Sequence, residues 1–412
     1  MSFVLSFTSR EHKLLKKGWT FMIIFAKKND NPISISKSNT LPPSVVSEIN
    51  GLAPKESLME NEEILLRTPT RVYNVRKGDT LYSISSRFGV DVNTILRNNP
   101  ELEGRSEIYE GQLLVVKYPT PTYGSIIVNG FYYYGCSLAA LIAALPHLSC
   151  ITVAAAFSDK NNLKMLFDDS EVLKVAKEYK KSAFLRIYGE FPHPKDNLQQ
   201  MLNACIIMAK SKGYDGLDIV PSNIKEKDSL SRLMLEAKKN AIENDLLLLC
   251  ECNAKEDCSF TDYADITIAR YDKSANKNVE SFEKGERKYL SAFADKFESA
   301  SAVLDISPFA YSQGKYLQKS EILHRARKKN GKFSLDPITL ECSVTIGEHT
   351  PKEYRFEGLC NLEKRLKLIS ELGFMGVSVD INRTQIAEIM LIEDMFYPIE
   401  GNRGVKGRCL RA

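Results

Sequence analysis

Two patterns of apolar and polar positions alternate from residue 125 onward. Short runs rich in Val, Ile, Ala and Phe have the character of buried strands, and the segments between them carry apolar residues at helical spacing. This alternation indicates βα units around a parallel sheet. About 270 residues with this pattern fit a closed α/β barrel of eight strands, and a doubly wound sheet is the alternative. The predicted strands are 126–133, 150–157, 182–188, 214–220, 246–251, 264–269, 302–306 and 375–379, and the predicted helices are 137–145, 169–180, 197–212, 228–244 and 362–372.

A smaller unit precedes this region, between residues 72 and 117. A β-prone run at 72–75 leads to Gly78, which turns the chain, and a helix with apolar residues at helical spacing follows. A second helix begins after Asp91, and an apolar strand ends the unit. The pattern predicts a small βααβ unit of about 45 residues, followed by a stiff, proline-bearing linker at 118–124.

Residues 1–70 show no comparable pattern. Ser, Asn and Pro are frequent between 29 and 54, which predicts disorder. The apolar run 19–26 follows several lysines, as in a secretion signal, but two further lysines follow it at once. A signal or anchor, a mistaken start site and a disordered tail are the alternatives, and the run is too short to span a bilayer. We expect a low-order segment over 1–70, a small domain over 72–117, a barrel over 125–398 and a tail over 399–412.

Composition and charge exclude several classes of protein. The formal net charge of +4 over 412 residues is slight, so it gives no support for nucleic-acid binding. The nine cysteines are scattered and mostly lie in apolar runs, which predicts reduced thiols. Cys250, Cys252 and Cys258 are close in sequence but lack a second pair or nearby histidines. Neither a metal nor a cofactor is therefore predicted.

The clearest chemical pattern lies at 213–224, which has the character of a strand that runs into a loop. Because strand side chains alternate, Asp218, Val220 and Ser222 share the face that points into a barrel lumen, near the end where catalytic groups lie. With Asp215, these residues resemble the fourth-strand signature D-x-x-D-x-D-x-E of glycoside hydrolase family 18, the chitinase-like TIM barrels. Val220 stands where the third Asp is expected, and Ser222 where the catalytic Glu is expected.

This resemblance implies a (β/α)8 TIM barrel with a degenerate catalytic motif. In active members of the family the Glu protonates the glycosidic oxygen, and neither Val nor Ser can act as a general acid near neutral pH. Asp380 also replaces the tryptophan that forms the aromatic floor in such barrels. We therefore predict a barrel that does not hydrolyse glycan; the alternative is an acid relocated to Glu190 or Glu251, near the ends of the third and fifth predicted strands.

Other matches resemble one branch of family 18, the LysM-bearing spore cortex glucosaminidases and spore germination proteins of endospore-forming bacteria. Tyr271 and Asp272 resemble the end of the sixth-strand motif M-T-Y-D, in which Ala269 and Arg270 replace the first two residues. The segments 197–218 and 354–372 resemble a helix–strand unit and a penultimate helix of that branch.

The unit at 72–117 resembles a LysM domain along its whole length. LysM domains bind glycans that contain N-acetylglucosamine, chiefly peptidoglycan and chitin, in a shallow groove between two loops. Only one copy is visible in the sequence, so we expect modest affinity without avidity. The resemblance implies a groove built from Gly78, Asp79, Thr80 and Leu81 on one side and from Asn99, Pro100, Glu101 and Leu102 on the other.

Two functions stay open on the sequence. The first is a non-catalytic protein that binds peptidoglycan or a chitin-like glycan and uses its barrel as a scaffold or a surface for other spore or wall proteins. The second is an active glucosaminidase with an unusual acid. We expect a protein without a membrane span, associated with spore or cell wall and made without a clear signal peptide; a cytoplasmic protein is equally compatible with the sequence.

Overall fold

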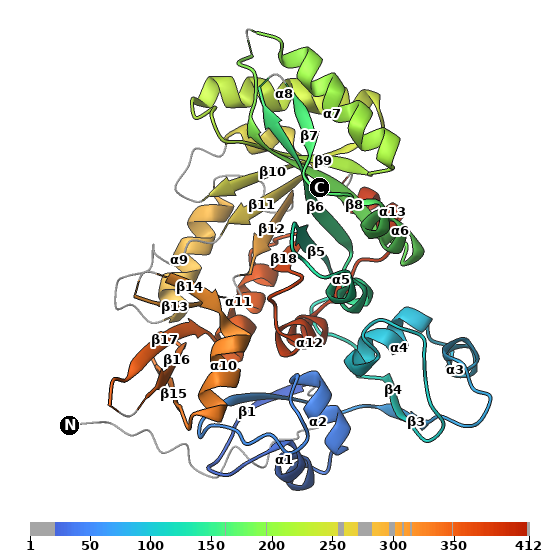
Figure 1. Ribbon diagram of the computed structural model, residues 1–412, viewed down its shortest axis with the longest axis vertical. Coiled ribbons are helices and arrows are strands. Elements are labelled where there is room, and N and C mark those ends of the chain that lie inside the picture. Colours follow the sequence, from blue (N-terminus) through green and yellow to red (C-terminus); the bar gives the residue numbers. More distant parts are fainter. Residues whose placement is uncertain are drawn as a thin grey trace.

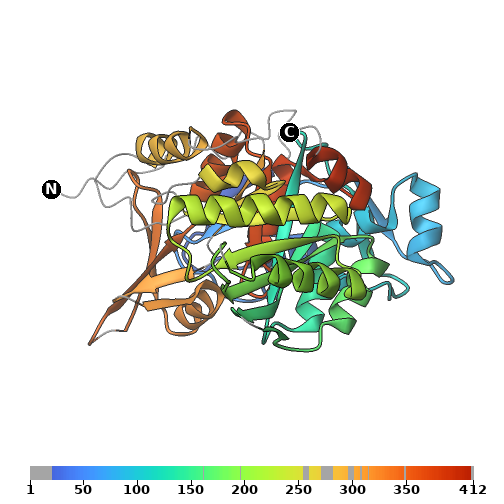
Figure 2. The ribbon, with the colours of Figure 1, turned by 90° about the horizontal axis from the view of Figure 1, so that it is seen from above.

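The computed structural model describes residues 21–160, 162–194, 196–253, 259–270, 282–295, 301–306, 309–313, 315–347 and 349–409. Two small βααβ units lie at the N-terminal end of this part, and a large barrel with one inserted sheet follows them (Figure 1). Figure 2 shows the long helices of the barrel lying against the outside of its strands. Within the described residues, no helix is long and apolar enough to cross a membrane.

The barrel is closed by parallel pairing between consecutive strands around the whole ring. All of the predicted strand positions lie in it, which confirms the α/β barrel and excludes the doubly wound sheet, because the first and last strands pair with each other. In the described residues the ring comprises eight strands: β5 (Ser125–Tyr133), β6 (Cys150–Asp159), β8 (Ser182–Glu190), β9 (Gly216–Pro221), β10 (Leu247–Asn253), β11 (Ile266–Arg270), β12 (Ala302–Asp305) and β18 (Gly376–Asp380).

Helices cover the outside of this ring and bury its outward-facing apolar side chains. The alternation within each strand explains the arrangement: Leu217 and Ile219 of β9 pack in the helix-facing core, whereas Asp218 between them faces the lumen. The helices of the barrel are α5 (Leu138–Ala144), α6 (Ser170–Glu178), α7 (Leu198–Lys212), α8 (Lys227–Glu243), α9 (Phe282–Ala294), α11 (Leu359–Glu371) and α12 (Ile386–Met395), with short strands β7 (Leu163–Met165) and β19 (Tyr397–Pro398) at its edges.

The segment expected as a tail is helical instead. Helix α13 (Asn402–Cys409) places Val405 in the apolar cluster that fills the lower lumen, beside Phe184 and Leu247. Because α13 buries Val405 in this cluster, the helix is part of the barrel domain. The expectation of a tail over 399–412 is corrected for residues 402–409, because burial of one apolar residue holds this helix against the barrel.

An antiparallel sheet is inserted between β12 and α11. Its strands are joined in the order β14, β13, β17, β16, β15, and one helix packs on it. Sequence patterning did not separate this insertion from the barrel. Its elements are β13 (Phe309–Ser312), β14 (Lys315–Gln318), α10 (Lys319–Lys328), β15 (Lys332–Leu335), β16 (Glu341–Ile346) and β17 (Lys352–Glu357).

Residues 21–67 form an ordered βααβ unit, so the expectation of a low-order segment over 1–70 is corrected for them. Val46, Ile64 and Leu66 lie in its small core. The Asn and Pro residues that predicted disorder begin helices instead: Asn31 caps the first helix and Pro32 occupies its first turn. Its elements are β1 (Phe21–Phe25), α1 (Pro32–Asn39), α2 (Pro43–Ile49) and β2 (Glu63–Arg67), with β1 and β2 antiparallel.

The second βααβ unit has the elements that the sequence predicts. Its two strands pair antiparallel, and two helices with a buried apolar face lie between them in sequence. Arg97 and the buried Arg67 of the first unit both reach the barrel, where Arg67 Nε lies 2.7 Å from Asp394 Oδ1. The elements of the second unit are β3 (Arg71–Asn74), α3 (Leu81–Phe88), α4 (Val92–Asn98) and β4 (Leu113–Lys117).

One cysteine departs from the expectation of reduced thiols. Cys252, at the end of β10, is disulfide-bonded. Other described cysteines, such as Cys205 and Cys250, are free thiols within the apolar core. The prediction therefore holds for these buried thiols and fails for Cys252, whose position at a strand end sequence patterning does not distinguish from a core position.

Candidate functional site

The residues that resemble the fourth-strand signature lie on β9 or directly beside it, and they occupy three different environments. Asp215 precedes the strand, and its carboxylate accepts a hydrogen bond of 2.9 Å from the backbone N–H of Ala183. Asp218 is fully buried in the lumen. Val220 is half-buried, and Ser222 is exposed just beyond the strand, with its N–H donating to the carbonyl of Gly189 at 2.7 Å.

Asp218 is held in a chain of charged side chains that crosses the lumen. Its Oδ2 lies 2.5 Å from Arg186 Nε, and Arg186 Nη2 lies 2.8 Å from Glu251 Oε2. Glu251 Oε1 in turn lies 2.9 Å from Arg270 Nε, and Arg270 Nη1 lies 2.7 Å from Asp305 Oδ2. Carboxylates and guanidiniums therefore alternate along this series of ion pairs, and its five residues come from the five neighbouring strands β8 to β12. We call these five residues the lumen charge ladder.

One aromatic ring supports both cations of the ladder. The guanidinium carbons of Arg186 and Arg270 lie 4.5 and 4.9 Å from the centre of the Phe131 ring, which projects from β5. Planar guanidiniums gain from contact with a ring face, and the ring shields them from water. Below the ladder the lumen is filled by apolar side chains such as Phe184, Leu249 and Ile268. This level of the lumen is thus packed and charge-paired.

The two carboxylates considered as relocated acids both have cationic partners. Burial raises the pKa of Glu251, but the guanidiniums of Arg186 and Arg270 outweigh it and hold the pKa below its ordinary value. Glu190 ends β8 as an exposed side chain, with Oε2 at 3.3 Å from Lys160 Nζ. A general acid needs a proton near neutral pH, and the environment of Glu251 works against one.

Asp380 occupies the end of β18, where the resemblance expects an aromatic floor. The hydroxyl of Tyr133, at the end of β5, donates to its carboxylate at 3.2 Å, and the Arg383 guanidinium lies over the Tyr133 ring. Burial raises the pKa of Asp380 above its ordinary value, although Arg383 opposes the shift. The position is filled by a polar cluster that ties neighbouring strand ends together. Tyr271 and Asp272 lie outside the described residues.

The residues expected to form a glycan groove in the second βααβ unit divide into exposed and buried groups. Gly78, Asp79 and Thr80 form the turn before α3; Asp79 accepts hydrogen bonds from the Tyr73 hydroxyl at 2.7 Å and the Arg76 N–H at 2.8 Å. Thr80 caps α3. Leu81 is buried in the core of the unit and offers no groove surface.

The opposite wall of that groove is corrected by the structure. Asn99 and Leu102 are buried, and the side chain of Asn99 forms hydrogen bonds with the backbone of Ile95 and Val115. Glu101 faces Glu48 of α2 in the first unit, and burial together with this second carboxyl raises the pKa of Glu101 to about 8. Asn99 and Leu102 do not line an open surface because the core and backbone of their own unit hold them, and Glu101 does not because α2 of the first unit packs against it. Pro100 is half-buried between them.

Two exposed tyrosines that sequence reasoning missed lie beside the open wall. Tyr82 follows Leu81 on α3 and is 77% exposed, and Tyr109 lies in the loop before β4 and is 74% exposed. That loop is joined to the turn before α3 by the hydrogen bonds Val75 N to Gln112 O, 2.9 Å, and Gly111 N to Val75 O, 2.8 Å. Exposed tyrosines bordering a loop groove are a signal for carbohydrate contact, because an amphipathic ring suits a sugar face. We call Gly78, Asp79, Thr80, Tyr82 and Tyr109 the open loop face.

Comparison with known families decides the identity of this unit. The family model described as "LysM domain" matches residues 73–117. Residues 73–117 are a LysM domain. Its strands β3 and β4 are the paired strands seen in the structure, and the match covers the unit from end to end.

Solved structures resemble the chain over most of its length. The spore cortex-lytic enzyme SleL of Bacillus cereus is 17% identical with a TM-score of 0.71, and that of Bacillus megaterium QM B1551 is 16% identical with a TM-score of 0.70; each match covers 92% of this chain and 99% of the other. A chitinase from Chromobacterium violaceum is 13% identical over 66% of this chain and 99% of its own, with a TM-score of 0.58. At these identities the likeness shows a shared fold. No curated protein matches the chain significantly.

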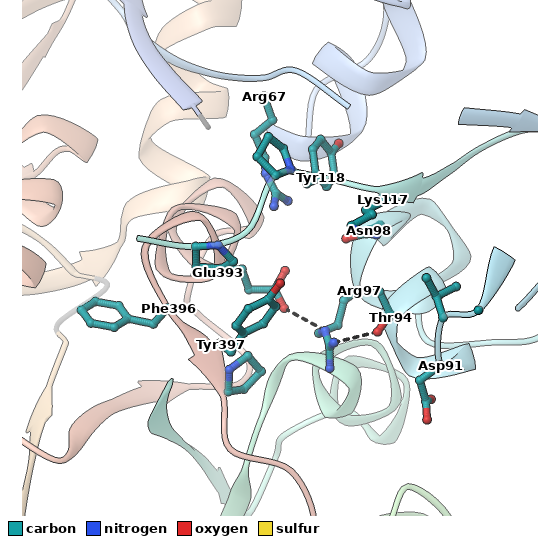
Figure 3. A pocket seen from close by; sticks show the side chains of 15 residues that line it. Arg67, Asp91, Thr94, Arg97, Asn98, Lys117, Tyr118, Glu393, Phe396 and Tyr397 are labelled. Atoms are coloured by element: carbon teal, nitrogen blue, oxygen red, sulfur yellow. Dashed lines mark hydrogen bonds and ion pairs between the residues drawn. The ribbon is translucent and has the colours of Figure 1, made fainter. Parts of the chain in front are cut away.

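A crevice of about 310 Å³ separates the LysM domain, the linker and the end of α12. Figure 3 shows Arg97 of the LysM domain between Glu393 of the barrel and Thr94 of its own helix; Arg97 donates to Thr94 Oγ1 at 3.0 Å and lies 3.8 Å from Glu393 Oε1. Glu393 also lies 3.0 Å from His147 Nδ1. Arg97 and His147 both lie beside Glu393 at this junction. These contacts hold the LysM domain against the barrel.

Within the described ranges, no group of three or more His, Cys, Asp or Glu side chains could hold a metal ion. The candidate sites are therefore the open loop face of the LysM domain and the mouth of the barrel above the lumen charge ladder. The first presents exposed hydroxyls and tyrosine rings, and in the second the buried carboxylates are paired with Arg186 and Arg270.

Proposed function

We propose that the chain binds peptidoglycan through its LysM domain and that its barrel is a family 18-like scaffold that does not hydrolyse glycan. The observation that carries the second part is the lumen charge ladder. Of the two carboxylates that match the motif, Asp215 is bound to the Ala183 N–H and Asp218 is paired with Arg186 at 2.5 Å; the motif positions beyond them are Val220 and Ser222. No group of the motif can deliver a proton to a glycosidic oxygen, and loss of general acid catalysis costs about a hundred- to ten-thousandfold in rate.

The pairing of Glu251 supports the same conclusion. A relocated acid would have to be protonated before it meets the substrate, yet Glu251 lies between two guanidiniums at 2.8 and 2.9 Å. Glu190 is exposed beside Lys160, away from the buried ladder. Neither resembles the carboxyl group in an apolar pocket that a glycosidase uses as its acid.

The LysM domain supplies the binding function. Its open loop face combines loop amides and hydroxyls with two exposed tyrosine rings. These groups match the acetamido, hydroxyl and apolar faces of N-acetylglucosamine units. The two SleL structures are described as spore cortex-lytic enzymes, which supports the spore cortex or the cell wall as the place where the chain acts. Chitin-like glycan offers the same sugar and is the comparison ligand.

The experiment is a digestion of purified spore cortex peptidoglycan and of chitin oligomers by the full chain. New reducing ends and muropeptide masses report cleavage, and sedimentation with the insoluble glycan reports binding. We expect binding without products. Release of products by the natural chain would overturn the scaffold, and Glu190 and Glu251 would then be replaced in turn to find the acid.

Two double variants sharpen this result. Val220→Asp with Ser222→Glu restores the carboxylates of the motif, and Val220→Asn with Ser222→Gln has nearly the same shape without an acid. Activity in the first variant alone would show that only the acid positions had been lost. Absence of activity in both would show that the polar cluster at Asp380 or the lumen charge ladder also prevents catalysis.

Binding is tested at the open loop face. Tyr82→Ala and Tyr109→Ala should each weaken sedimentation with peptidoglycan by about tenfold, as expected for an exposed aromatic anchor. Tyr316→Ala is the matched control, because Tyr316 is also strongly exposed but lies on β14 of the insertion. Equal loss in all three variants would contradict a site on the LysM domain.

A further inference from the structure

We propose that residues 21–67 are a second LysM-type domain, whose loop face has become a docking surface for the inserted sheet of the barrel. The proposal extends the function given above, since it takes the open loop face of residues 73–117 as the glycan-binding surface. It rests on a comparison of the two βααβ units within this chain, position by position, and on what covers each of them.

The turn before the first helix is the same in both units when positions are shifted by 49 residues. Asn29 and Gly78 both adopt left-handed backbone conformations, with φ of 68° and 84°. In the first unit Lys27 N–H donates to Asp30 Oδ2 at 2.8 Å, and in the second Arg76 N–H donates to Asp79 Oδ2, also at 2.8 Å. A carboxylate therefore closes the same turn at the same position.

The first helix begins and ends in the same way in both units. Asn31 and Thr80 each form a reciprocal capping box with a serine three residues later. Both helices then end at a left-handed residue, Thr40 with φ of 57° and Gly89 with φ of 63°. The shift of 49 residues holds at both ends of the helix.

An asparagine joins the second helix to the last strand in each unit; Asn99 is buried and Asn50 is half-buried. In the LysM domain, Asn99 donates to Val115 O at 2.8 Å and accepts from Val115 N at 2.7 Å. In the first unit, Asn50 donates to Leu65 O and accepts from Leu65 N, both at 2.8 Å. Each asparagine also donates to the carbonyl four residues before it. A side chain that satisfies three backbone groups in this way is a fold-specific contact.

The loop before the last strand repeats as well, now with a shift of 50 residues. Met59 N–H donates to Glu62 Oε2 at 3.1 Å, and Tyr109 N–H donates to Gln112 Oε1 at 3.1 Å. Ala26 exchanges backbone hydrogen bonds with residues 61 and 62, as Val75 does with residues 111 and 112. The two units thus share their turns, caps and side-chain anchors, which a general βααβ arrangement does not require.

The surfaces of the two units differ where the LysM domain is open. Met59 stands at the position of Tyr109, but it is only 5% exposed and packs in the core of the insertion with Ala310 and Ile322. Beside it, Glu62 Oε1 accepts from Arg327 of α10 at 2.6 and 2.9 Å. Arg327 also donates to Glu56 at 3.2 Å. The insertion therefore covers the Met59 and Glu62 side of the loop face of the first unit, as their adjacent positions in Figure 1 agree, whereas Asn29, at the position of Gly78, stays exposed.

This arrangement gives the chain one open glycan-binding face and one closed face. The closed face binds the insertion where the open face would bind sugar. Arg327 holds the two surfaces together through Glu62 and Glu56. Glu62 is buried, so its pairing with Arg327 must be kept for the two surfaces to remain together.

The test compares Arg327→Met with Arg325→Met in the full chain. Arg325 is an exposed residue of the same helix and serves as the matched control. We expect Arg327→Met to accelerate amide hydrogen exchange in the first unit and in β15 and β16 by about ten- to a hundredfold, because a buried charge-assisted pair is lost. Sedimentation with peptidoglycan should stay unchanged, and Arg325→Met should alter neither measurement. Glu62→Gln, which keeps the shape and removes the charge, should give a smaller acceleration in the same segments.

Two outcomes would overturn the proposal. Unchanged exchange in both Arg327→Met and Glu62→Gln would mean that the face is not a dock. A loss of glycan binding in these variants as large as that in Tyr82→Ala would mean that the first unit binds sugar directly. If the natural chain does not sediment with any glycan, the proposed function fails, whereas the exchange measurement still decides whether the first unit is docked.

Discussion

The two βααβ units carry the same turns, the same caps and an asparagine bonded to three backbone groups, yet they present the corresponding surface to different surroundings. Tyr109 of the LysM domain is exposed to solvent, and Met59 at the same position of the first unit is buried against the insertion. The comparison teaches that a few buried polar anchors fix this small fold. What covers its loop face then decides whether the unit can bind a ligand or serves to join domains.

The largest expected effect tests whether the asparagine in each unit, Asn50 or Asn99, stabilises its unit to the same extent. Asn50→Ala and Asn99→Ala each remove hydrogen bonds to three backbone groups. At about 1 kcal/mol for each bond, both should lower the free energy of unfolding of their unit by about 3 kcal/mol. Hydrogen exchange at the amides of Leu65 and Val115 measures the two effects separately, and Asn203→Ala on the exposed side of α7 is the control. A neutral result in one unit would break the equivalence.

The next effect tests whether the loop before the last strand is buried in the first unit and exposed in the LysM domain. Met59→Ala removes a buried side chain and should cost about 2 to 4 kcal/mol of stability, whereas Tyr109→Ala at the equivalent position should change stability by less than about 0.5 kcal/mol. Chemical denaturation of the full chain measures both. Equal costs would show that the loop faces are equally buried in solution.

A smaller effect concerns the turn before the first helix. Gly78→Ala places a Cβ at a left-handed position and should cost about 1 kcal/mol, although no other atom lies within 4 Å of that Cβ. Asn29→Gly, the reciprocal change, should be nearly neutral because Asn tolerates this conformation. Denaturant midpoints measure the difference, and a costly Asn29→Gly would show that the Asn29 side chain has a role of its own.

The smallest effect is a pH dependence at the contact between the units. Glu48 and Arg97 stand at equivalent positions, 49 residues apart, but Glu48 faces a carboxyl of the other unit. Burial, and then Glu48, raises the pKa of Glu101 to about 8, and Gln112 opposes the shift. A carboxyl whose pKa is higher in the folded state contributes stability at low pH, and this contribution is lost as pH rises from about 4.5 to about 8.

Thermal unfolding between pH 5 and pH 9 measures this contribution. Between pH 5 and pH 9, the Tm of Glu101→Gln should fall by about 2 °C less than the Tm of the natural chain. Glu103→Gln, an exposed neighbour on the same loop, should leave the decline unchanged. A steeper decline in Glu101→Gln would contradict the direction of the shift.

The strands of the barrel could be predicted because each is buried on both faces. Runs such as 150–157 and 246–251 are therefore almost continuously apolar, and this pattern does not depend on which strands they pair with. The LysM domain could be predicted for a similar reason: its turn, caps and helical spacing are local. The degenerate motif was visible because Val220 and Ser222 are read directly from the sequence.

The candidate site depended on contacts that no local pattern contains. No local pattern marks Arg186 and Arg270 as partners of Glu251, yet they pair with it and hold its pKa below its ordinary value. Residues 21–67 resisted prediction because their Asn and Pro residues favour both disorder and helix caps, and only burial of side chains such as Val46 and Leu65 selects the caps. The burial of Glu101 could not be foreseen without Glu48 and the first unit that packs beside it.

The sequence by itself determined the barrel, the LysM domain and the departures of Val220 and Ser222 from the family 18 pattern, because strand periodicity, capping residues and motif positions are properties of neighbours along the chain. Only the tertiary structure decided how Asp218 and Glu251 are paired with guanidiniums, that residues 21–67 form the same βααβ arrangement as residues 73–117, and that Arg327 of the insertion pairs with Glu62 of the first unit. The physical reason is the same in each case: these outcomes depend on pairing between side chains far apart in the sequence, and desolvation gives that pairing its energy.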